Sequence, residues 1–121
     1  HINQLVALDI PCIMVGGSIK KTTNSCIGPI TETTLRTLYF SKCFLGANGF
    51  SITSGITNHD INERVIKLLA LNNSCQPYFL IDHTKYGIVT MVQIANLDQY
   101  PILIDEIPED LENYKNFILC E

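Results

Sequence analysis

The chain has 121 residues, of which 46% are hydrophobic and 17% charged, so it is long and apolar enough to fold as one domain around a single core. Its net charge of −4 and the scatter of its eight lysines and arginines argue against direct binding of DNA or RNA by these residues. No run approaches the 18 uninterrupted apolar residues of a membrane helix, and the first residues lack the basic start and cleavage site of a signal peptide.

The first third of the chain is predicted to contain two helical stretches and one strand. Residues 2–8 have the pattern of the end of a helix, and residues 12–16 (CIMVG) that of a buried strand stopped by a pair of glycines. Residues 29–39 form the next predicted helix, with a proline in its first turn. Its apolar stripe consists of Ile30, Leu35 and Leu38.

The middle of the chain continues the alternation. Residues 42–47 (KCFLGA) and 77–82 (PYFLID) are predicted to be buried strands. Between them lies the clearest helix, residues 60–72, which Asn58 or Asp60 caps. The apolar positions of this helix share one face and are Ile61, Val65, Leu68 and Leu69.

The last third is predicted to be mostly short strands. They span residues 89–95, 101–104 and 117–120, and residues 108–116 form a short helix that begins near a proline. Apolar strands separated by helices are typical of an α/β protein with a mostly parallel sheet that is covered on both faces.

Five cysteines occur, at positions 12, 26, 43, 75 and 120. Their number is odd and their spacing never gives the close pairs of a zinc site. We therefore expect free, mostly buried thiols in a reducing cytoplasm, and neither a metal site nor a catalytic cysteine.

Ligands of parallel sheets bind at the carboxyl ends of the strands, and three predicted strand ends carry unusual loops. The first is Gly16-Gly17, where backbone N–H groups can approach an anion closely, although a plain turn explains the pair equally well. It is no nucleotide-phosphate loop, because Lys20 stands where that motif requires glycine. A dinucleotide-binding GxGxxG motif is absent as well, so no nucleotide cofactor is expected.

The second strand end reads GANGF and includes Asn48 and Gly49. The Asn48 amide can donate and accept hydrogen bonds but cannot act as a general base, which suits recognition of a polyol better than proton transfer. The alternative is that Asn48-Gly49 forms only a tight turn.

The third strand end, DHTKYG, delivers Asp82, Thr84 and Lys85. A lysine at the mouth of a cleft supplies the positive charge that a phosphate group needs. The alternative is a solvated lysine beside an aspartate that caps a turn, and His83 is given no catalytic role. The GxSxG nucleophile elbow of serine hydrolases is absent. A general acid/base pair could be drawn from the carboxylates at 82, 98, 105 and 106, but nothing in the sequence requires an enzyme.

Taken together and in order, the segments VGGSIKK, CIGPITETTLRTLYFSKCFLGANGF, SGITN, FLIDHTKYG and ILIDEIP resemble the effector domain of the DeoR family of bacterial sugar regulators. The resemblance extends from about Ile10 to Pro108. Within the family, the chain is similar to the lactose phosphotransferase repressors of Gram-positive bacteria.

The resemblance implies a Rossmann-like fold related to ribose-5-phosphate isomerase and glucosamine-6-phosphate deaminase. It also implies a phosphorylated sugar as effector, a homo-oligomer, and operator DNA bound through an N-terminal winged helix-turn-helix that residues 1–121 do not contain. The first strand of the effector domain and its SGTTT-like loop are missing too, so the chain is expected to be a fragment. By position, the pocket-lining loops of the family match Gly16, Gly17, Asn48, Gly49, Gly55, Thr57, Asp82, Thr84 and Lys85.

Two alternatives to a sensor stay open at this point. One is a sugar-phosphate isomerase or deaminase of the same fold, with Asp82 as the best remaining base. The related enzymes place a carboxylate and a histidine near the second strand end, where this chain has Asn48-Gly49-Phe50, so we expect sensing without turnover. The other is a pure oligomerisation module, because the apolar composition allows a buried interface as well as a core.

Overall fold

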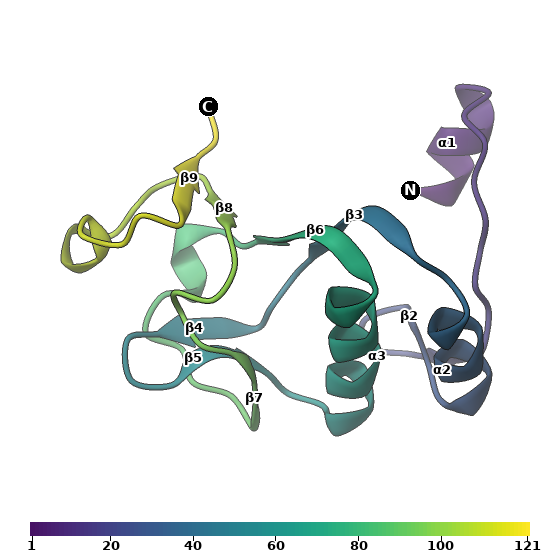
Figure 1. Cartoon of the computed structure of the whole chain (residues 1–121), viewed down its shortest axis with the longest axis horizontal. Coiled ribbons are helices and arrows are strands. Elements are labelled where there is room, and N and C mark those ends of the chain that lie inside the picture. The colour runs from purple at the N-terminus through teal and green to yellow at the C-terminus, as the bar shows by residue number, and fades with distance from the viewer.

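The computed structural model describes all of residues 1–121 and has α/β architecture (Figure 1). The main sheet is fully parallel, with the strand order β3-β6-β8-β9. Its strands are β3 (Phe40–Leu45), β6 (Ser74–Leu80), β8 (Ile102–Ile104) and β9 (Phe117–Leu119). The α/β class and the mostly parallel sheet are therefore confirmed.

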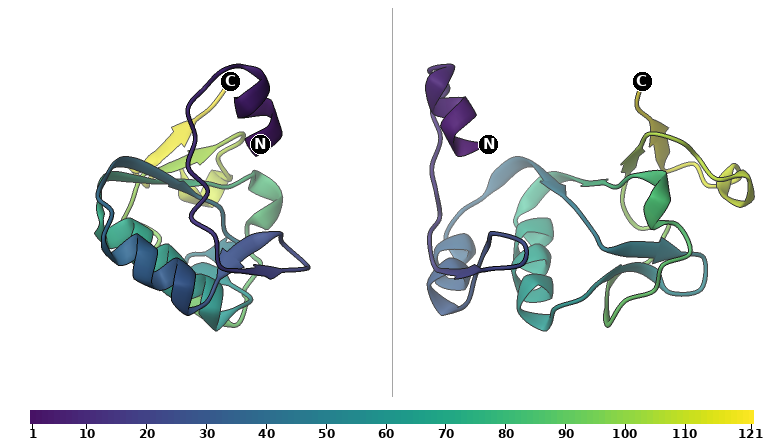
Figure 2. Two further views of the ribbon diagram at one scale, coloured as in Figure 1. Left: turned by 90° about the vertical axis from the view of Figure 1, so that its right-hand side faces the viewer. Right: turned by 180° about the vertical axis from the view of Figure 1, so that it is seen from behind.

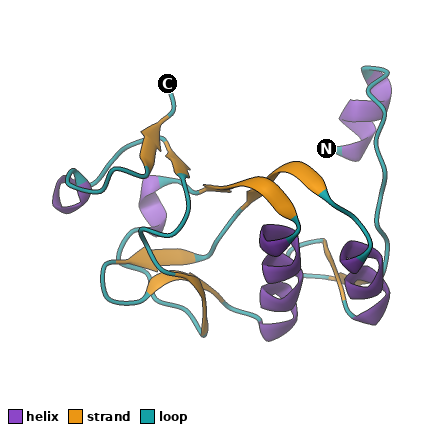
Figure 3. Cartoon of the chain, viewed as in Figure 1, coloured by secondary structure: helices purple, strands orange, loops and turns teal.

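Two smaller antiparallel units and three helices complete the chain (Figure 3). The strands are β1 (Ser18–Lys20) and β2 (Ser25–Ile27), which form a hairpin, and β4 (Gly49–Ser51), β5 (Gly55–Asn58) and β7 (Val92–Ala95), which form a sheet. The helices are α1 (Ile2–Ala7), α2 (Pro29–Arg36) and α3 (Ile61–Asn72), with single 3-10 turns η1 (His83–Lys85) and η2 (Glu109–Leu111). No helix has the length and apolar character needed to cross a membrane.

The hydrophobic core lies on one face of the main sheet. A row of side chains in register across the four strands points into it, namely Leu45, Phe79, Ile102 and Phe117. Phe50 and Ile56 from the antiparallel sheet meet this row and are fully buried. Leu71 of α3 joins the same cluster, so the helix and the antiparallel sheet share one face of the parallel sheet (Figure 1).

The opposite face of the main sheet, which we call the outer face, is not covered. It carries the alternate side chains Phe44, Tyr78, Leu80, Leu103 and Ile118. Phe44 and Leu80 are 57% and 58% exposed, and the Phe44 and Tyr78 rings stack with centroids 5.4 Å apart. The prediction of a sheet covered on both faces is therefore wrong for these residues, because α2 and α3 lie on the same side (Figure 2).

The strand predicted at residues 12–16 does not form. These residues make no backbone hydrogen bond to a neighbouring strand, and Ile13 is 90% exposed. They run as an extended connection from α1, which buries no residue, to the β1–β2 hairpin (Figure 2). An apolar run becomes a strand only where another strand satisfies its backbone groups, and none lies beside it.

Three smaller expectations also change. The predicted helix at 108–116 is only the 3-10 turn η2, and Ile30 in the predicted stripe of α2 is 67% exposed. The cysteines are free but not mostly buried, since Cys12, Cys75 and Cys120 are exposed and the other two are intermediate. The short C-terminal strand and the cap of α3 are confirmed, because Asp60 accepts hydrogen bonds from the first turn of that helix.

Candidate functional site

A polar cleft of about 470 Å³ lies where β3 ends, and we call it the β3-exit cleft. The hairpin β1–β2, the turn after β3, the end of β5 and the first two turns of α3 all contribute to its wall. The lining residues are His1, Thr23, Ser25, Gly46, Ala47, Asn48, Asn58, Glu63 and Lys67. Only one of them is hydrophobic, so the cleft suits a ligand rich in polar groups.

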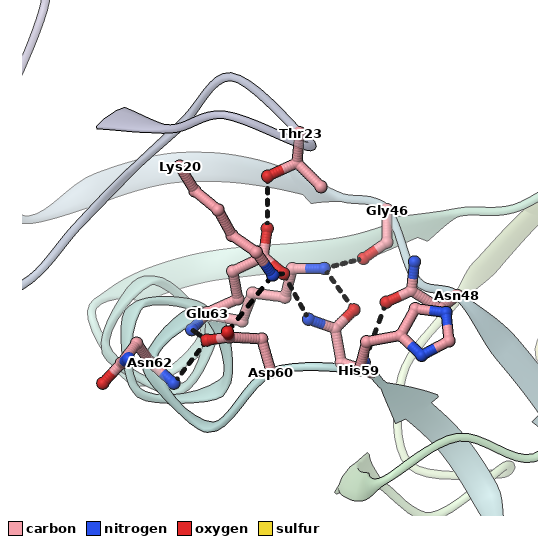
Figure 4. Close-up of polar contacts among 10 residues, drawn as sticks. Lys20, Thr23, Gly46, Asn48, His59, Asp60, Asn62 and Glu63 are labelled. Carbon is pink, nitrogen blue, oxygen red and sulfur yellow. Dashed lines mark hydrogen bonds and ion pairs between the residues drawn. The ribbon is translucent and has the colours of Figure 1, made fainter. Parts of the chain in front are cut away.

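Glu63 lies at the centre of this cleft, in the first turn of α3, and is only 6% exposed. Its Oε1 accepts a hydrogen bond from the Thr23 hydroxyl at 2.9 Å, and its Oε2 accepts from Lys20 at 3.2 Å and from the Asn58 amide at 3.3 Å (Figure 4). Burial acts to raise the pKa of Glu63, but hydrogen bonds from Thr23, Lys20 and Ser25 outweigh it and hold the pKa below its usual value. The carboxylate is therefore ionised and fully engaged, which makes it a poor general base.

Lys67 follows Glu63 by four residues and so lies on the same face of α3. Its Nζ donates to the Gly46 carbonyl at 2.6 Å and to Asn58 Oδ1 at 3.0 Å. No carboxylate oxygen lies within 4.0 Å of this ammonium. Burial lowers the pKa of Lys67, and the nearby charge of Glu63 opposes that shift. Asn58, which is 1% exposed, bridges the two charges through its amide group.

The β1–β2 hairpin is tied to the start of α3 by one lysine. Lys20 Nζ lies 3.2 Å from Asp60 Oδ2 and 3.2 Å from Glu63 Oε2. Asp60 also caps the helix, since its Oδ1 accepts from the backbone N–H of Asn62 at 2.7 Å and of Glu63 at 3.0 Å. The hairpin thus forms one wall of the cleft because an ion pair and the Thr23 hydroxyl hold it there (Figure 4).

Asn48 completes the cleft at the turn after β3. Its Oδ1 accepts a hydrogen bond from the backbone N–H of His59 at 3.0 Å, while its Nδ2 has no partner. The side chain is thus fixed at one end and free to donate at the other. The alternative of a tight Asn48-Gly49 turn is not what forms, because residues 46–48 connect β3 to β4 with a bend at Asn48, and Gly49 already begins β4.

The DHTKYG loop at the end of β6 is more exposed and is held by contacts within the loop and with the residues that follow β8. Asp82 accepts hydrogen bonds from the backbone N–H of Thr84 at 3.0 Å and from its hydroxyl, which lowers the pKa of Asp82. His83 Nδ1 lies 2.7 Å from Asp105 Oδ2, and this contact raises the pKa of His83. Lys85 forms no side-chain hydrogen bond or ion pair.

Backbone contacts bring this loop beside the GANGF turn. The N–H of Gly87 donates to the Phe50 carbonyl at 2.9 Å, and the Phe50 and Tyr86 rings lie 5.4 Å apart. A side chain at position 49 would overlap the Ile88 carbonyl, which explains the glycine there. Thr57 supports the same junction, because its hydroxyl hydrogen bonds to Thr90.

The remaining predicted residues lie away from the cleft. Gly16 and Gly17 pack against α2, where the Thr31 hydroxyl donates to the Gly16 carbonyl at 2.7 Å and leaves no room for a side chain at position 17. Gly55 begins β5, at the opposite end of that strand from Asn58, and has a φ of +66°. These glycines therefore shape the backbone and do not line the β3-exit cleft.

Three residues that line the cleft, Asn58, Glu63 and Lys67, were not singled out as site residues from the sequence, and neither was Lys20, which contacts Glu63. A signal was available for two of them, since an acid and a base four residues apart on an amphipathic helix must share a face. That this pair on α3 lies beside the end of β3 is decided by the fold. No local sequence pattern indicates that Lys20 and Asn58 belong to the same cluster.

Comparison with known proteins identifies what the chain is similar to. A family model described as the DeoR C-terminal sensor domain matches residues 1–106. The HTH-type transcriptional regulator IolR of Bacillus subtilis is 32% identical over 112 residues, which cover 92% of this chain and 45% of that protein. The lactose phosphotransferase system repressor of Staphylococcus aureus is 31% identical over 107 residues, covering 87% and 42%.

A third relative, the uncharacterized HTH-type transcriptional regulator FruR of Bacillus subtilis, is 28% identical over 116 residues, covering 95% of this chain and 46% of that protein. The chain thus spans less than half the length of the curated relatives it matches.

Proposed function

The chain belongs to the DeoR C-terminal sensor domain family, and on that premise we propose that it binds a phosphorylated sugar and thereby controls a transcriptional repressor. The family is one of sensor domains, and the relatives are transcriptional regulators, so the chain is not an enzyme. The name of the Staphylococcus aureus repressor supports a sugar-related effector.

The observation that carries this proposal is that the DHTKYG loop contacts the GANGF segment, whose Asn48 lines the β3-exit cleft. The cleft offers hydrogen-bond donors and acceptors, and the loop offers Lys85, whose ammonium has no partner. We assign binding of the phosphate to Thr84 and Lys85, and binding of the sugar to the backbone of Asn48-Gly49. Asp82 orders the loop. Gly16, Gly17, Gly55 and Thr57 are assigned a supporting role in shaping the backbone, since none of them lines the cleft.

In this proposal, ligand binding changes the affinity of a longer regulator for its operator DNA. The DNA-binding part lies outside residues 1–121, in keeping with their net charge of −4 and with the greater length of the relatives. A regulator of this kind works in the cytoplasm as a homo-oligomer, and the apolar outer face of the sheet is a surface that a subunit contact would use.

Thermal unfolding of the full-length regulator with a panel of hexose and pentose phosphates tests the proposal. A ligand that binds only the folded state stabilises it by RT ln(1 + [L]/Kd), about 2.7 kcal/mol at a hundredfold excess over Kd. An upward shift with one phosphosugar, together with altered operator binding, is the expected result. No shift with any member of the panel would contradict it.

Lys85→Ala gives the residue-level test. Because the side chain has no partner in the unliganded structure, we expect the stability without ligand to stay within about 0.5 kcal/mol of the wild type. We expect most of the ligand-induced shift to disappear. An unchanged shift would clear Lys85 of a role in phosphate binding.

A pure oligomerisation module is the second candidate, and the exposed outer face favours it. Light scattering that shows an oligomer, combined with no binding of any phosphosugar, would support this alternative against the sensor.

A further inference from the structure

The β3-exit cleft carries a balanced set of charges, which bears on the part of a ligand that it can take. In its lining, Lys67 and Glu63 carry opposite charges, and beside the cleft Lys20 pairs with Glu63 and Asp60. Lys20 contacts both carboxylates, so it is not available to an incoming anion. Glu63 is 6% exposed, and water screens its charge poorly. A phosphate dianion bound here would add two negative charges beside the Glu63 carboxylate, and Lys67 is the one lysine of the lining available to balance them.

The cleft does have unused hydrogen-bonding capacity. An ammonium has three N–H donors, and Lys67 uses two of them, on Gly46 and Asn58. Asn48 Nδ2 has no partner at all. Both side chains line the cleft, and each is held in place by the hydrogen bonds that it already makes. Donors fixed in this way are suited to read the position of a neutral hydroxyl oxygen.

The Glu63 carboxylate sets the orientation of this arrangement without needing to touch ligand. It accepts from Asn58 Nδ2, which leaves Asn58 Oδ1 pointing at Lys67. The Thr23 hydroxyl donates to Glu63, so its oxygen keeps the capacity to accept a hydrogen bond on the same wall. Glu63 is accordingly a positioning residue, and Lys67 is the contact.

Resting on the proposed function, we propose that Lys67 binds a hydroxyl group of the sugar, not its phosphate, and selects among sugar phosphates by the stereochemistry of that hydroxyl. A buried donor left unpaired by the wrong epimer costs about tenfold to a hundredfold in affinity. The phosphate lies outside the cleft. This assigns to Lys67 a role in specificity that is separate from the phosphate contact proposed for Lys85.

The test measures dissociation constants of the full-length regulator by calorimetry. The probes are the 6-phosphates of glucose, galactose and mannose, which differ at single hydroxyl groups, with ribose 5-phosphate and inorganic phosphate. Lys67→Met removes the three donors, and Lys21→Met is the matched control, because Lys21 is an exposed lysine of the β1–β2 hairpin with no side-chain hydrogen bond.

We expect the wild type to prefer one sugar phosphate over an epimer by about tenfold or more. In Lys67→Met, affinity for the preferred compound falls by about tenfold to a hundredfold, the epimer ratio approaches one, and binding of inorganic phosphate is unchanged. Lys21→Met behaves as the wild type. Unfolding curves without ligand check that each variant is folded, and Lys67→Gln replaces Lys67→Met if the latter is not.

Three results would overturn the inference while leaving the proposed function intact. The first is that Lys67→Met leaves all affinities unchanged, and the second is that the wild type binds all epimers equally. The third is that Lys67→Met loses binding of inorganic phosphate but keeps the epimer ratio, which would place the phosphate at Lys67. A wild type that binds no sugar phosphate would refute the proposed function first, and the inference with it.

Discussion

The ends of β3 and β6 are neighbours in space, yet they are built in different ways. At the end of β6, residues 82–87 form one short loop, in which Asp82 bonds to Thr84 while His83 reaches Asp105 and Tyr86 reaches Asp110. At the end of β3, the polar groups come from positions 20, 23, 58, 63 and 67, and contacts such as Thr23 to Glu63 join residues 40 apart. Polar residues gathered in one short loop are visible as a motif in the sequence, whereas a cluster assembled from distant segments is not.

The difference extends to what controls the charges. At the end of β6, the pKa values of Asp82 and His83 are shifted by hydrogen bonds with Thr84 and Asp105, and these side chains are exposed. At the end of β3, burial acts on both Glu63 and Lys67. Changes at the β3 exit should therefore affect folding strongly, and changes at the β6 exit should affect it weakly.

Phe50→Ala should have the largest effect, because this side chain joins the two strand ends. Phe50 is fully buried, and its ring lies 5.4 Å from that of Tyr86 and 6.2 Å from that of Phe117. We expect the free energy of unfolding, measured by urea denaturation, to fall by about 3–5 kcal/mol. Phe44→Ala on the outer face is the control, and an equal loss there would contradict the assignment of the core to one face.

Glu63→Ala should rank second. It removes the acceptor of the buried Asn58 amide, and leaving that group unpaired costs about 1–3 kcal/mol. Glu112 is an exposed glutamate whose side chain makes no hydrogen bond, so Glu112→Ala should have almost no effect.

The pH dependence of stability in a second variant, Glu63→Gln, sharpens the prediction. Because the pKa of Glu63 is lowered on folding, the stability that it contributes is present above its unfolded pKa. That contribution is lost as pH falls through the folded pKa. The difference in the free energy of unfolding between the wild type and Glu63→Gln should therefore be largest at neutral pH and decrease in acid. A gap that grows in acid would contradict the hydrogen-bonded carboxylate.

His83→Gln should have the smallest effect. The Asp105 contact raises the pKa of His83, so its contribution is present below the unfolded pKa near 6.5 and lost as pH rises through the folded pKa. The melting temperature of the wild type should be slightly higher than that of His83→Gln at about pH 5.5 and equal to it at about pH 8.5. The difference at about pH 5.5 should be smaller in high salt. A constant difference at both pH values would mean that the ion pair is not responsible.

The predictions from the sequence are correct where the residues that determine an element lie within a short segment. The helix ending at Asn72, its Asp60 cap and the alternation of strands and helices were all predicted, and the ordered motifs indicated the correct family. The prediction failed at residues 12–16, whose apolar side chains do satisfy a strand pattern. The pattern reports the chemistry of those side chains, but a strand also requires a partner for its backbone.

By itself, the sequence determined the α/β class, the family and the loop at the end of β6, because hydrophobic periodicity, helix caps and turn chemistry act over a few residues. Only the tertiary structure decided that one face of the sheet is open, that the glycine pair packs against α2, and that Lys20, Asn58, Glu63 and Lys67 meet at one cleft. The burial and hydrogen bonding that define such a cleft depend on distances between segments far apart in the chain, which no local pattern specifies.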